Sequence, residues 1–387
     1  MTVLPDDSDS GLAHRIHGAR GLGVIVLTSG GSGALALLLR TPGASRTVLD
    51  AHIPYGQSAL ESFLGGQPDQ ACAPDTARAM AMAAFHRARS LEPDAALFGI
   101  SCTASLVTDR PKQGGHRVHV GLQTANRSDL FSVELIAGAR SRSEEEAICD
   151  RLLLNALAEA KGISSAAAPV WRPGENLAEL RCQAPKHWQE LVLGSRRAID
   201  ARAPQSPDPE SRARLIFPGA FNPVHDGHLG MARVATELTG LSPEFELCIR
   251  NVDKPPLNYA AIYERLAHLP PSSRVWLTTT PTFVEKAEQF PGATFMVGID
   301  TLERIAEPRY YGHDPEARDR ALLRIGDAGC RFLVFGRSSS EGFVGLEDRS
   351  WPPLLRALAS GIPEHSFRHD LSSSELRLRR TLNAYTE

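Results

Sequence analysis

The stretch RLIFPGAFNPVHDGHLG, residues 214–230, decides the fold of the C-terminal half of this chain. Its apolar run (residues 215–217) predicts a strand, a Gly/Pro turn follows, and the residues from His225 onward lead into a helix. Phosphates bind where backbone N–H groups at a helix N-terminus point into the crevice at the ends of parallel strands. Gly219 lets a backbone approach a nucleotide, and the imidazoles of His225 and His228 can donate hydrogen bonds to phosphate oxygens. The stretch therefore predicts a phosphate-binding turn.

A zinc site is the alternative interpretation of two histidines this close together. No third Cys, His or acidic residue follows at a zinc-like spacing, so no metal site is predicted here. The six cysteines lie far apart, at positions 72, 102, 149, 182, 248 and 330, without a C-x-x-C pair. Such cysteine usage indicates reduced thiols in a cytoplasmic protein rather than a disulfide framework.

The overall composition excludes several classes of protein. The chain has 387 residues, enough for about two domains, and its 42% hydrophobic and 22% charged residues are typical of a globular protein. Lys+Arg 42 against Asp+Glu 45 gives a net charge of -3, which argues against a nucleic-acid binder. The longest uncharged stretch, residues 21–39, is interrupted by TSGGSG, so no membrane span is predicted. The first ten residues, MTVLPDDSDS, contain no apolar segment typical of a secretory signal.

Strand-like and helix-like segments alternate along most of the chain, which predicts an α/β fold with two domains. Residues 1–20 are expected to be a loose arm, and residues 21–162 a first α/β domain. Residues 163–212 are Pro-rich and are interpreted as an interdomain connector that carries a helix over 187–200. The alternative is that this segment packs onto one of the two domains. Residues 213–387 are expected to form a second α/β domain.

The second domain resembles the HxGH nucleotidyltransferase superfamily, whose pattern is G-x-F-x-P-x-H-x-G-H. DLSSSELRLRR (residues 370–380) is similar to the second nucleotide motif of these enzymes, I-S-S-T-x-I-R. Within the superfamily, the nearest resemblance is to the nicotinamide/nicotinate mononucleotide adenylyltransferases. It rests on FMVGIDTL (295–302), on DKPP (253–256) followed by YERL (263–266), and on RFLVFGR (331–337).

This resemblance implies a Rossmann-like domain with a parallel sheet, in which a mononucleotide phosphate attacks the α-phosphorus of ATP and pyrophosphate is released. Mg²⁺ is expected to arrive with ATP, without fixed protein ligands. The acceptor is expected to be a mononucleotide, with nicotinamide or nicotinate mononucleotide favoured. Whether it is a pyridine nucleotide, whether it carries the amide or the acid, and whether the chain forms a homo-oligomer are left open. The residues implied in catalysis are His225, His228, Lys254 and Arg377. Those implied in nucleotide binding are Gly219, Ala220, Phe221, Gly298, Asp300, Arg337, Ser372, Ser373 and Ser374.

The first domain resembles the CinA C-terminal family, which includes nicotinamide mononucleotide deamidases. The likeness lies in TSGGS (28–32, family S-C-T-G-G), PGAS (42–45, family G-S-S) and PYGQ (54–57, family T-Y-S-N). The family uses a nucleophilic serine near a tyrosine and a lysine, so Ser45 and Tyr55 are the candidates in this chain. Leu60 stands where the family has its lysine, and a leucine side chain cannot activate a serine.

Two further functions are alternatives to the adenylyltransferase. In one, the CinA-like domain is an amidohydrolase that acts on nicotinamide mononucleotide. In the other, both domains bind nucleotides without turnover, and the occupancy of their sites controls a partner.

Overall fold

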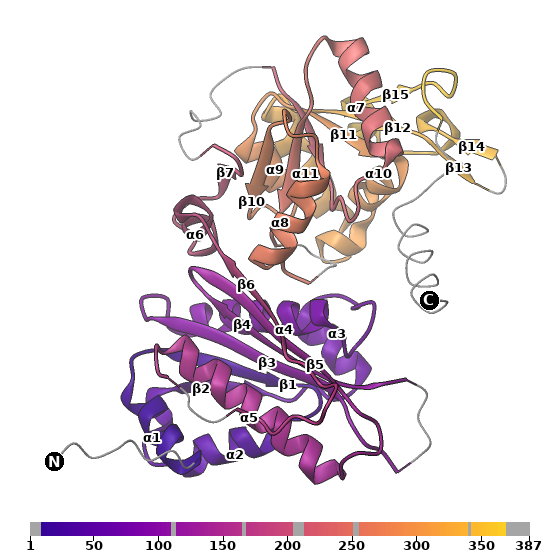
Figure 1. Cartoon of the computed structure of the whole chain (residues 1–387). Coiled ribbons are helices and arrows are strands. Elements are labelled where there is room, and N and C mark those ends of the chain that lie inside the picture. Colours follow the sequence, from indigo (N-terminus) through magenta and orange to yellow (C-terminus); the bar gives the residue numbers. More distant parts are fainter. Residues whose placement is uncertain are drawn as a thin grey trace. The chain divides into compact units, whose positions relative to one another are not determined.

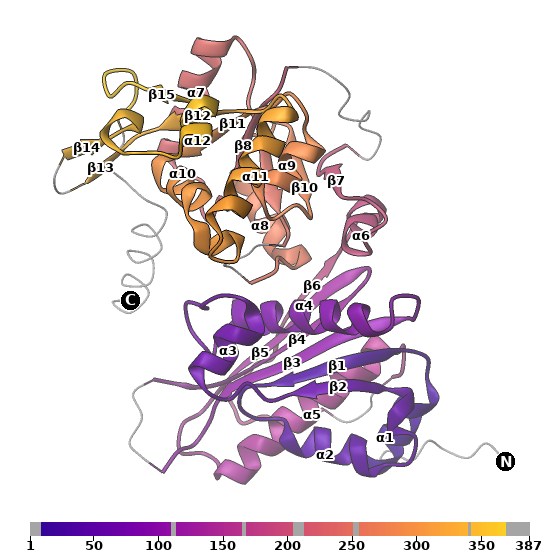
Figure 2. The same ribbon diagram turned by 180° about the vertical axis from the view of Figure 1, so that it is seen from behind.

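The computed structural model describes residues 9–109, 114–164, 168–203, 213–250, 255–339 and 342–368, which form two compact units (Figures 1 and 2). The N-terminal unit comprises the described parts of Met1–Gln189 and Asn251–Ala261, and the C-terminal unit those of Glu190–Arg250 and Ile262–Glu387. Each unit contains a mixed α/β arrangement around one large sheet, as the alternating sequence pattern predicts. Within the described residues, none of the helices is both long and apolar enough to cross a membrane.

The N-terminal unit is built on a six-stranded sheet in the order β2-β1-β3-β4-β5-β6. The strands β1, β2 and β3 run parallel, and the remaining neighbours pair antiparallel. The strands are β1 (Leu22–Leu27), β2 (Val48–His52), β3 (Leu97–Ser105), β4 (His116–Thr124), β5 (Arg127–Leu135) and β6 (Ala178–Gln183).

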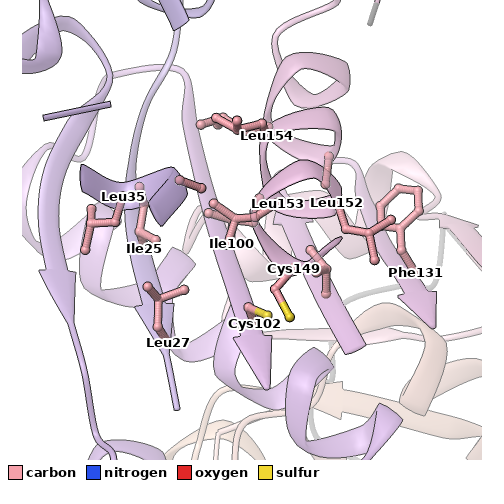
Figure 3. Close-up of a cluster of buried hydrophobic side chains, with 14 of the residues drawn as sticks. Ile25, Leu27, Leu35, Ile100, Cys102, Phe131, Cys149, Leu152, Leu153 and Leu154 are labelled. Carbon is pink, nitrogen blue, oxygen red and sulfur yellow. The ribbon is translucent and has the colours of Figure 1, made fainter. Parts of the chain in front are cut away.

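Helices cover both faces of this sheet (Figure 1). The helices are α1 (Asp9–Gly18), α2 (Ser32–Arg40), α3 (Gln57–Leu64), α4 (Pro74–Leu91) and α5 (Arg142–Ala160), with a 3₁₀ turn η1 (Ala44–Arg46) before β2. The larger core lies between the sheet and α1, α2 and α5, and Figure 3 shows it as a layer of branched aliphatic side chains. The free cysteines Cys102 and Cys149 are buried in this layer.

Two segments are more ordered than the sequence pattern suggests. Residues 9–18, within the expected loose arm, form α1, because Leu12, Ala13 and Ile16 share one face of the helix and are buried. Within the Pro-rich connector, residues 178–183 form β6, which adds an edge strand to β5. The described part of Asn251–Ala261 also belongs to the N-terminal unit, where the Tyr259 hydroxyl donates to the carbonyl of Ala125 (2.6 Å).

The C-terminal unit is built on a seven-stranded sheet in the order β15-β12-β11-β8-β9-β10-β7. All neighbouring strands are parallel except β10 and β7. The strands are β7 (Ala198–Asp200), β8 (Leu215–Pro218), β9 (Glu244–Cys248), β10 (Val275–Thr278), β11 (Thr294–Gly298), β12 (Arg331–Phe335) and β15 (Ala359–Ile362), and a separate ribbon pairs β13 (Arg337–Ser339) with β14 (Gly342–Val344).

The order of these strands creates a switch point beside β8. From β8 the chain first builds β9 and β10 on one side and then returns to build β11, β12 and β15 on the other. In open parallel sheets, ligands bind at the carboxyl ends of the strands where the order reverses, which here is between β8 and β11. The remaining helices are α6 (Lys186–Val192), α7 (Asp226–Thr239), α8 (Tyr259–His268), α9 (Phe283–Gln289), α10 (Ile299–Ala306), α11 (Pro315–Asp327) and α12 (Pro353–Leu358), with 3₁₀ turns η2 (Pro308–Tyr311) and η3 (Leu346–Asp348).

A buried ion pair fastens the segment before β6 to the N-terminal unit. The guanidinium of Arg140 contacts both carboxylate oxygens of Glu175 (2.5 and 2.7 Å), which also accept hydrogen bonds from the backbone N–H groups of Ile136 and Arg172. The hydrogen bonds from Arg140 are the main reason why the pKa of Glu175 falls from 4.5 to about 2. The charged carboxylate is therefore much more favourable in the folded chain than in the unfolded chain.

We expect this pair to make stability depend on acid pH. A pKa lowered by this amount corresponds to about 3 kcal/mol. The contribution is complete above pH 4.5 and is lost as the pH falls toward 2. Glu175→Gln should lower the free energy of unfolding by about 3 kcal/mol at pH 7, measured by denaturant unfolding with hydrogen exchange of β5, and by much less near pH 2.

Glu179→Gln is the matched control, because Glu179 pairs with Arg181 on the surface. Exposed pairs contribute at most about 1 kcal/mol. Equal effects of the two variants at pH 7 would contradict the role of the buried pair.

Candidate functional site

The carboxyl ends of β8, β11 and β12 bring distant parts of the sequence to one edge of the C-terminal sheet. Because neighbouring parallel strands end at the same edge, the segments that follow these strands lie next to one another. Gly219 follows β8, Gly298 ends β11, and Arg337 follows β12 after one intervening glycine. Three of the segments that the sequence identifies thus meet at the switch point.

The two histidines of the β8–α7 turn lie against each other at the start of α7. His225 is the N-cap residue of this helix, and its ring centroid lies 3.8 Å from that of His228. The backbone N–H of His225 donates to Nδ1 of His228 (3.2 Å). Both side chains are half-buried at the helix N-terminus. Here the positive end of the helix dipole favours an anion.

The sequence predicts nucleotide contacts for Gly219, Ala220 and Phe221. In the structure, Phe221 and Gly219 take part in packing within the turn. Phe221 is only 2% exposed, and its ring packs among aromatic side chains of the sheet and the turn. Gly219 is needed for this packing, because a Cβ there would lie 2.5 Å from the Phe221 ring. Ala220 stays half-buried between them. Gly227, between the two histidines, is buried inside the first turn of α7.

Asp300 and Arg337 form an ion pair at the same edge. Asp300 lies in the first turn of α10, directly after β11, and Arg337 begins β13. Nη1 of Arg337 lies 2.6 Å from Oδ2 of Asp300, and each side chain is about half exposed. Apart from Gly298 and its chain neighbours, no atom of the described residues lies within 4 Å of where a Cβ on Gly298 would be, so they leave the backbone at the end of β11 uncovered at this position. The pair therefore presents an accessible guanidinium and carboxylate at the end of β11.

The last described residues of the chain approach α7. The Phe367 ring contacts the Phe335 ring at the end of β12 (centroids 5.2 Å apart), and it lies 3.0 Å from where a Cβ on Gly230 of α7 would be. Of the residues that the sequence implies in the site, Lys254, Ser372, Ser373, Ser374 and Arg377 lie outside the described residues.

A buried ion pair beside the turn is a feature that the sequence analysis missed. Glu246 of β9 and Lys286 of α9 are 1% and 5% exposed, and Nζ of Lys286 lies 2.7 Å from Oε1 of Glu246. Lys286 also donates to the Thr280 carbonyl (2.8 Å), and the backbone carbonyl of Glu246 accepts the N–H of Gly219 (3.0 Å). The sequence does contain a sign of this ion pair, namely a glutamate inside the apolar run FELC. A carboxylate buried in a strand needs a cationic partner.

In the N-terminal unit, the structure does not bring Ser45 and Tyr55 together. Ser45 lies in η1 before β2, and Tyr55 follows the end of β2. The five residues of β2 separate them by about 16 Å of strand. Both residues are exposed, and Leu60 is 2% exposed in an apolar cluster. No serine–tyrosine–lysine arrangement forms from these three positions.

The glycine turn between β1 and α2 is occupied by carboxylates from α5. The backbone N–H of Gly31 donates to Glu146 (3.1 Å), and that of Ala34 donates to Asp150 (2.8 Å). A Cβ on Gly33 would lie 2.2 Å from Oδ2 of Asp150. Burial raises the pKa of Asp150, although the backbone N–H groups of Ala34 and Gly33 favour its charged form. The donors with which such a turn binds phosphate are thus engaged within the chain.

Within the part of the chain that the structure describes, no group of three or more His, Cys, Asp or Glu side chains could hold a metal ion.

Comparisons with known proteins found one family model and several solved structures that resemble parts of the chain. The family model described as cytidylyltransferase-like matches residues 216–379. In solved structures, the N-terminal part is similar to the competence/damage inducible protein CihA from Agrobacterium tumefaciens (19% identity, 41% of this chain and 99% of that chain, TM-score 0.32). It is also similar to a CinA superfamily protein from Escherichia coli (15% identity, 41% and 94%, TM-score 0.33) and to one from Enterobacter cloacae (15% identity, 42% and 99%, TM-score 0.32). No curated protein sequence matches the chain.

The buried pair beside the turn predicts a large effect of removing one charge. Lys286→Met leaves the Glu246 carboxylate buried without its cation, and such a loss costs about 3–5 kcal/mol of unfolding free energy. The double variant Lys286→Met with Glu246→Leu should recover most of the lost unfolding free energy, because two apolar side chains leave no unpaired buried charge. Denaturant unfolding of the three proteins measures this, and a double variant as unstable as the single one would contradict the account.

Proposed function

We propose that residues 216–379, which form a cytidylyltransferase-like domain and therefore a nucleotidyltransferase domain, catalyse an adenylyl transfer. The reaction joins AMP from ATP to the phosphate of a mononucleotide and releases pyrophosphate. Nicotinamide or nicotinate mononucleotide is the proposed acceptor, on the sequence likeness of residues 295–302 and 331–337. The observation that carries the proposal is that the histidine pair, Asp300 and Arg337 all follow strands that end at the switch point.

The histidine pair suits the phosphates of ATP. Because Nδ1 of His228 accepts the N–H of His225, the neutral ring carries its proton on Nε2, and this N–H can donate a hydrogen bond to a phosphate oxygen. Charge builds up on the α- and β-phosphate oxygens as the pyrophosphate leaves, and a donor held at the helix N-terminus stabilises that charge. Mg²⁺ that arrives with ATP would neutralise part of the same charge.

Arg337 suits the phosphate of the acceptor. A guanidinium binds phosphate through two parallel hydrogen bonds, and Asp300 keeps this one at the strand end before the substrate arrives. We further propose that Lys254, Arg377 and the hydroxyls of Ser372, Ser373 and Ser374 complete the contacts to the triphosphate.

The geometry gives less support to an amidohydrolase in the N-terminal unit. A nucleophilic serine needs an activating base close by. Ser45 and Tyr55 lie at opposite ends of β2, and the glycine turn holds Glu146 and Asp150. We therefore assign the proposed reaction to the C-terminal unit alone.

A product assay tests this assignment directly. The full chain is incubated with Mg-ATP and each of several mononucleotides, while pyrophosphate and ammonia are followed together. We expect pyrophosphate without ammonia, and a fall in kcat of about 10²–10³ in His228→Ala, which is typical of removing one transition-state donor. Ammonia without pyrophosphate would instead favour the amidohydrolase, and binding without either product would favour a sensor.

The role of Arg337 makes a separate prediction about the acceptor. Arg337→Ala should raise KM for the mononucleotide about 10- to 100-fold, because a charged hydrogen bond contributes about 1.5–3 kcal/mol. KM for ATP should change less than about twofold if the guanidinium holds only the acceptor. Arg349→Ala is the matched control, because Arg349 makes a similarly exposed pair with Glu303 of the same helix. Equal effects of the two variants on KM would contradict the assignment.

A further inference from the structure

The imidazole of His228 is enclosed by groups that fix its position. The ring of Phe221 meets it edge-on (centroids 5.1 Å apart, planes at 70°), and the ring of Phe217 lies 6.0 Å away. The ring of His225 covers it at 3.8 Å, and the N–H of His225 donates to its Nδ1. These groups come from β8 and from the turn before α7, so the ring position depends on the turn rather than on α7 alone.

Phe221 itself has little freedom to move. Its ring lies edge-on to Phe217 (5.2 Å, 87°) and to Phe245 of β9 (5.1 Å, 76°), and the residue is 2% exposed. Its backbone has φ +44°, a conformation that non-glycine residues rarely adopt. Gly219 leaves the space into which the ring folds. A side chain held in this way is too buried to bind a nucleotide, but it can hold the imidazole beside it.

The hydrogen bond to Nδ1 also determines which nitrogen of His228 carries the proton. A nitrogen that accepts an N–H must keep its lone pair, so the neutral ring is protonated at Nε2. A doubly protonated ring would place an Nδ1–H against the N–H of His225. Two imidazolium rings at 3.8 Å would in addition repel each other. The nearest acidic neighbour in this turn, Asp226, is exposed.

We propose that Phe221 is a positioning residue that, together with the backbone N–H of His225, holds His228 as the neutral tautomer protonated at Nε2. The inference rests on the proposed adenylyl transfer and specifies how His228 acts in it. The imidazole donates one hydrogen bond to a phosphate oxygen and keeps its proton throughout, so the pyrophosphate leaves without a proton from this residue. The positive end of α7, rather than a charged imidazole, supplies the field at the site.

The tautomer can be measured without any assay of activity. The full chain is labelled with ¹⁵N-histidine, and the two-bond ¹H–¹⁵N correlations of the rings are recorded at pH 7.5; the signals that disappear in His228→Gln belong to His228. We expect an unprotonated Nδ1 and a protonated Nε2. An imidazolium pattern, or a proton on Nδ1, would overturn the proposal even if the enzyme is an adenylyltransferase.

The role of Phe221 is tested with Phe221→Leu. We expect a mixture of tautomers in the His228 signals and a fall in kcat of about 10²-fold, since a displacement of about 1 Å can cost that much. KM for ATP should change less than about twofold. Gly219→Ala should have the same effect, because the new methyl group displaces the Phe221 ring.

Phe290→Leu is the matched control, because Phe290 is equally buried in the same unit and packs on Trp276 instead of His228. It should leave both kcat and the His228 signals unchanged. If Phe221→Leu and Phe290→Leu behave alike, Phe221 has a purely structural role and the proposal fails. If the wild-type chain releases no pyrophosphate, the proposed function fails, while the NMR comparison still decides the tautomer.

Discussion

The parallel arrangement of β8 with β9 and β11 is the constraint on which the C-terminal unit depends. Parallel neighbours cannot be joined by a tight turn, so a helical crossover follows each strand and every carboxyl end faces the same edge. Because β8 lies in the middle and the chain builds outward on both sides, the turn at Gly219 and the start of α10 lie at the same edge of the sheet. Residues 75 positions apart, such as His225 and Asp300, thereby reach a common edge.

The two units show how similar turns can be used differently. After β8, the turn packs the aromatic ring of Phe221 against His228 in the first turn of α7. After β1, the corresponding donors of Gly31 and Ala34 bind carboxylates of α5, which ties α2 to α5. An internal carboxylate satisfies the same N–H groups that a phosphate would, so the second arrangement contributes to packing rather than to ligand binding.

Much of this could be predicted from sequence because it depends on local patterns. The α/β class follows from alternating segments, and the place of His225 follows from an apolar strand, a Gly/Pro turn and a helix. The ion pair of Asp300 with Arg337 could not be predicted as a contact, because it depends on strand order. The burial of Phe221 was missed because its motif resembles a binding loop, while its backbone conformation turns the ring into the core. Helix α1 was not predicted because its few apolar residues are interspersed with polar ones in the sequence.

The central claim is that a triphosphate and an acceptor phosphate meet at the carboxyl ends of β8, β11 and β12. A crystal structure of the full chain with a non-hydrolysable ATP analogue and a pyridine mononucleotide measures this most directly. The account predicts a phosphate oxygen within hydrogen-bond distance of Nε2 of His228 and the acceptor phosphate on Arg337. A triphosphate bound away from the histidine pair, or a mononucleotide seated on the turn at residues 28–33, would contradict it.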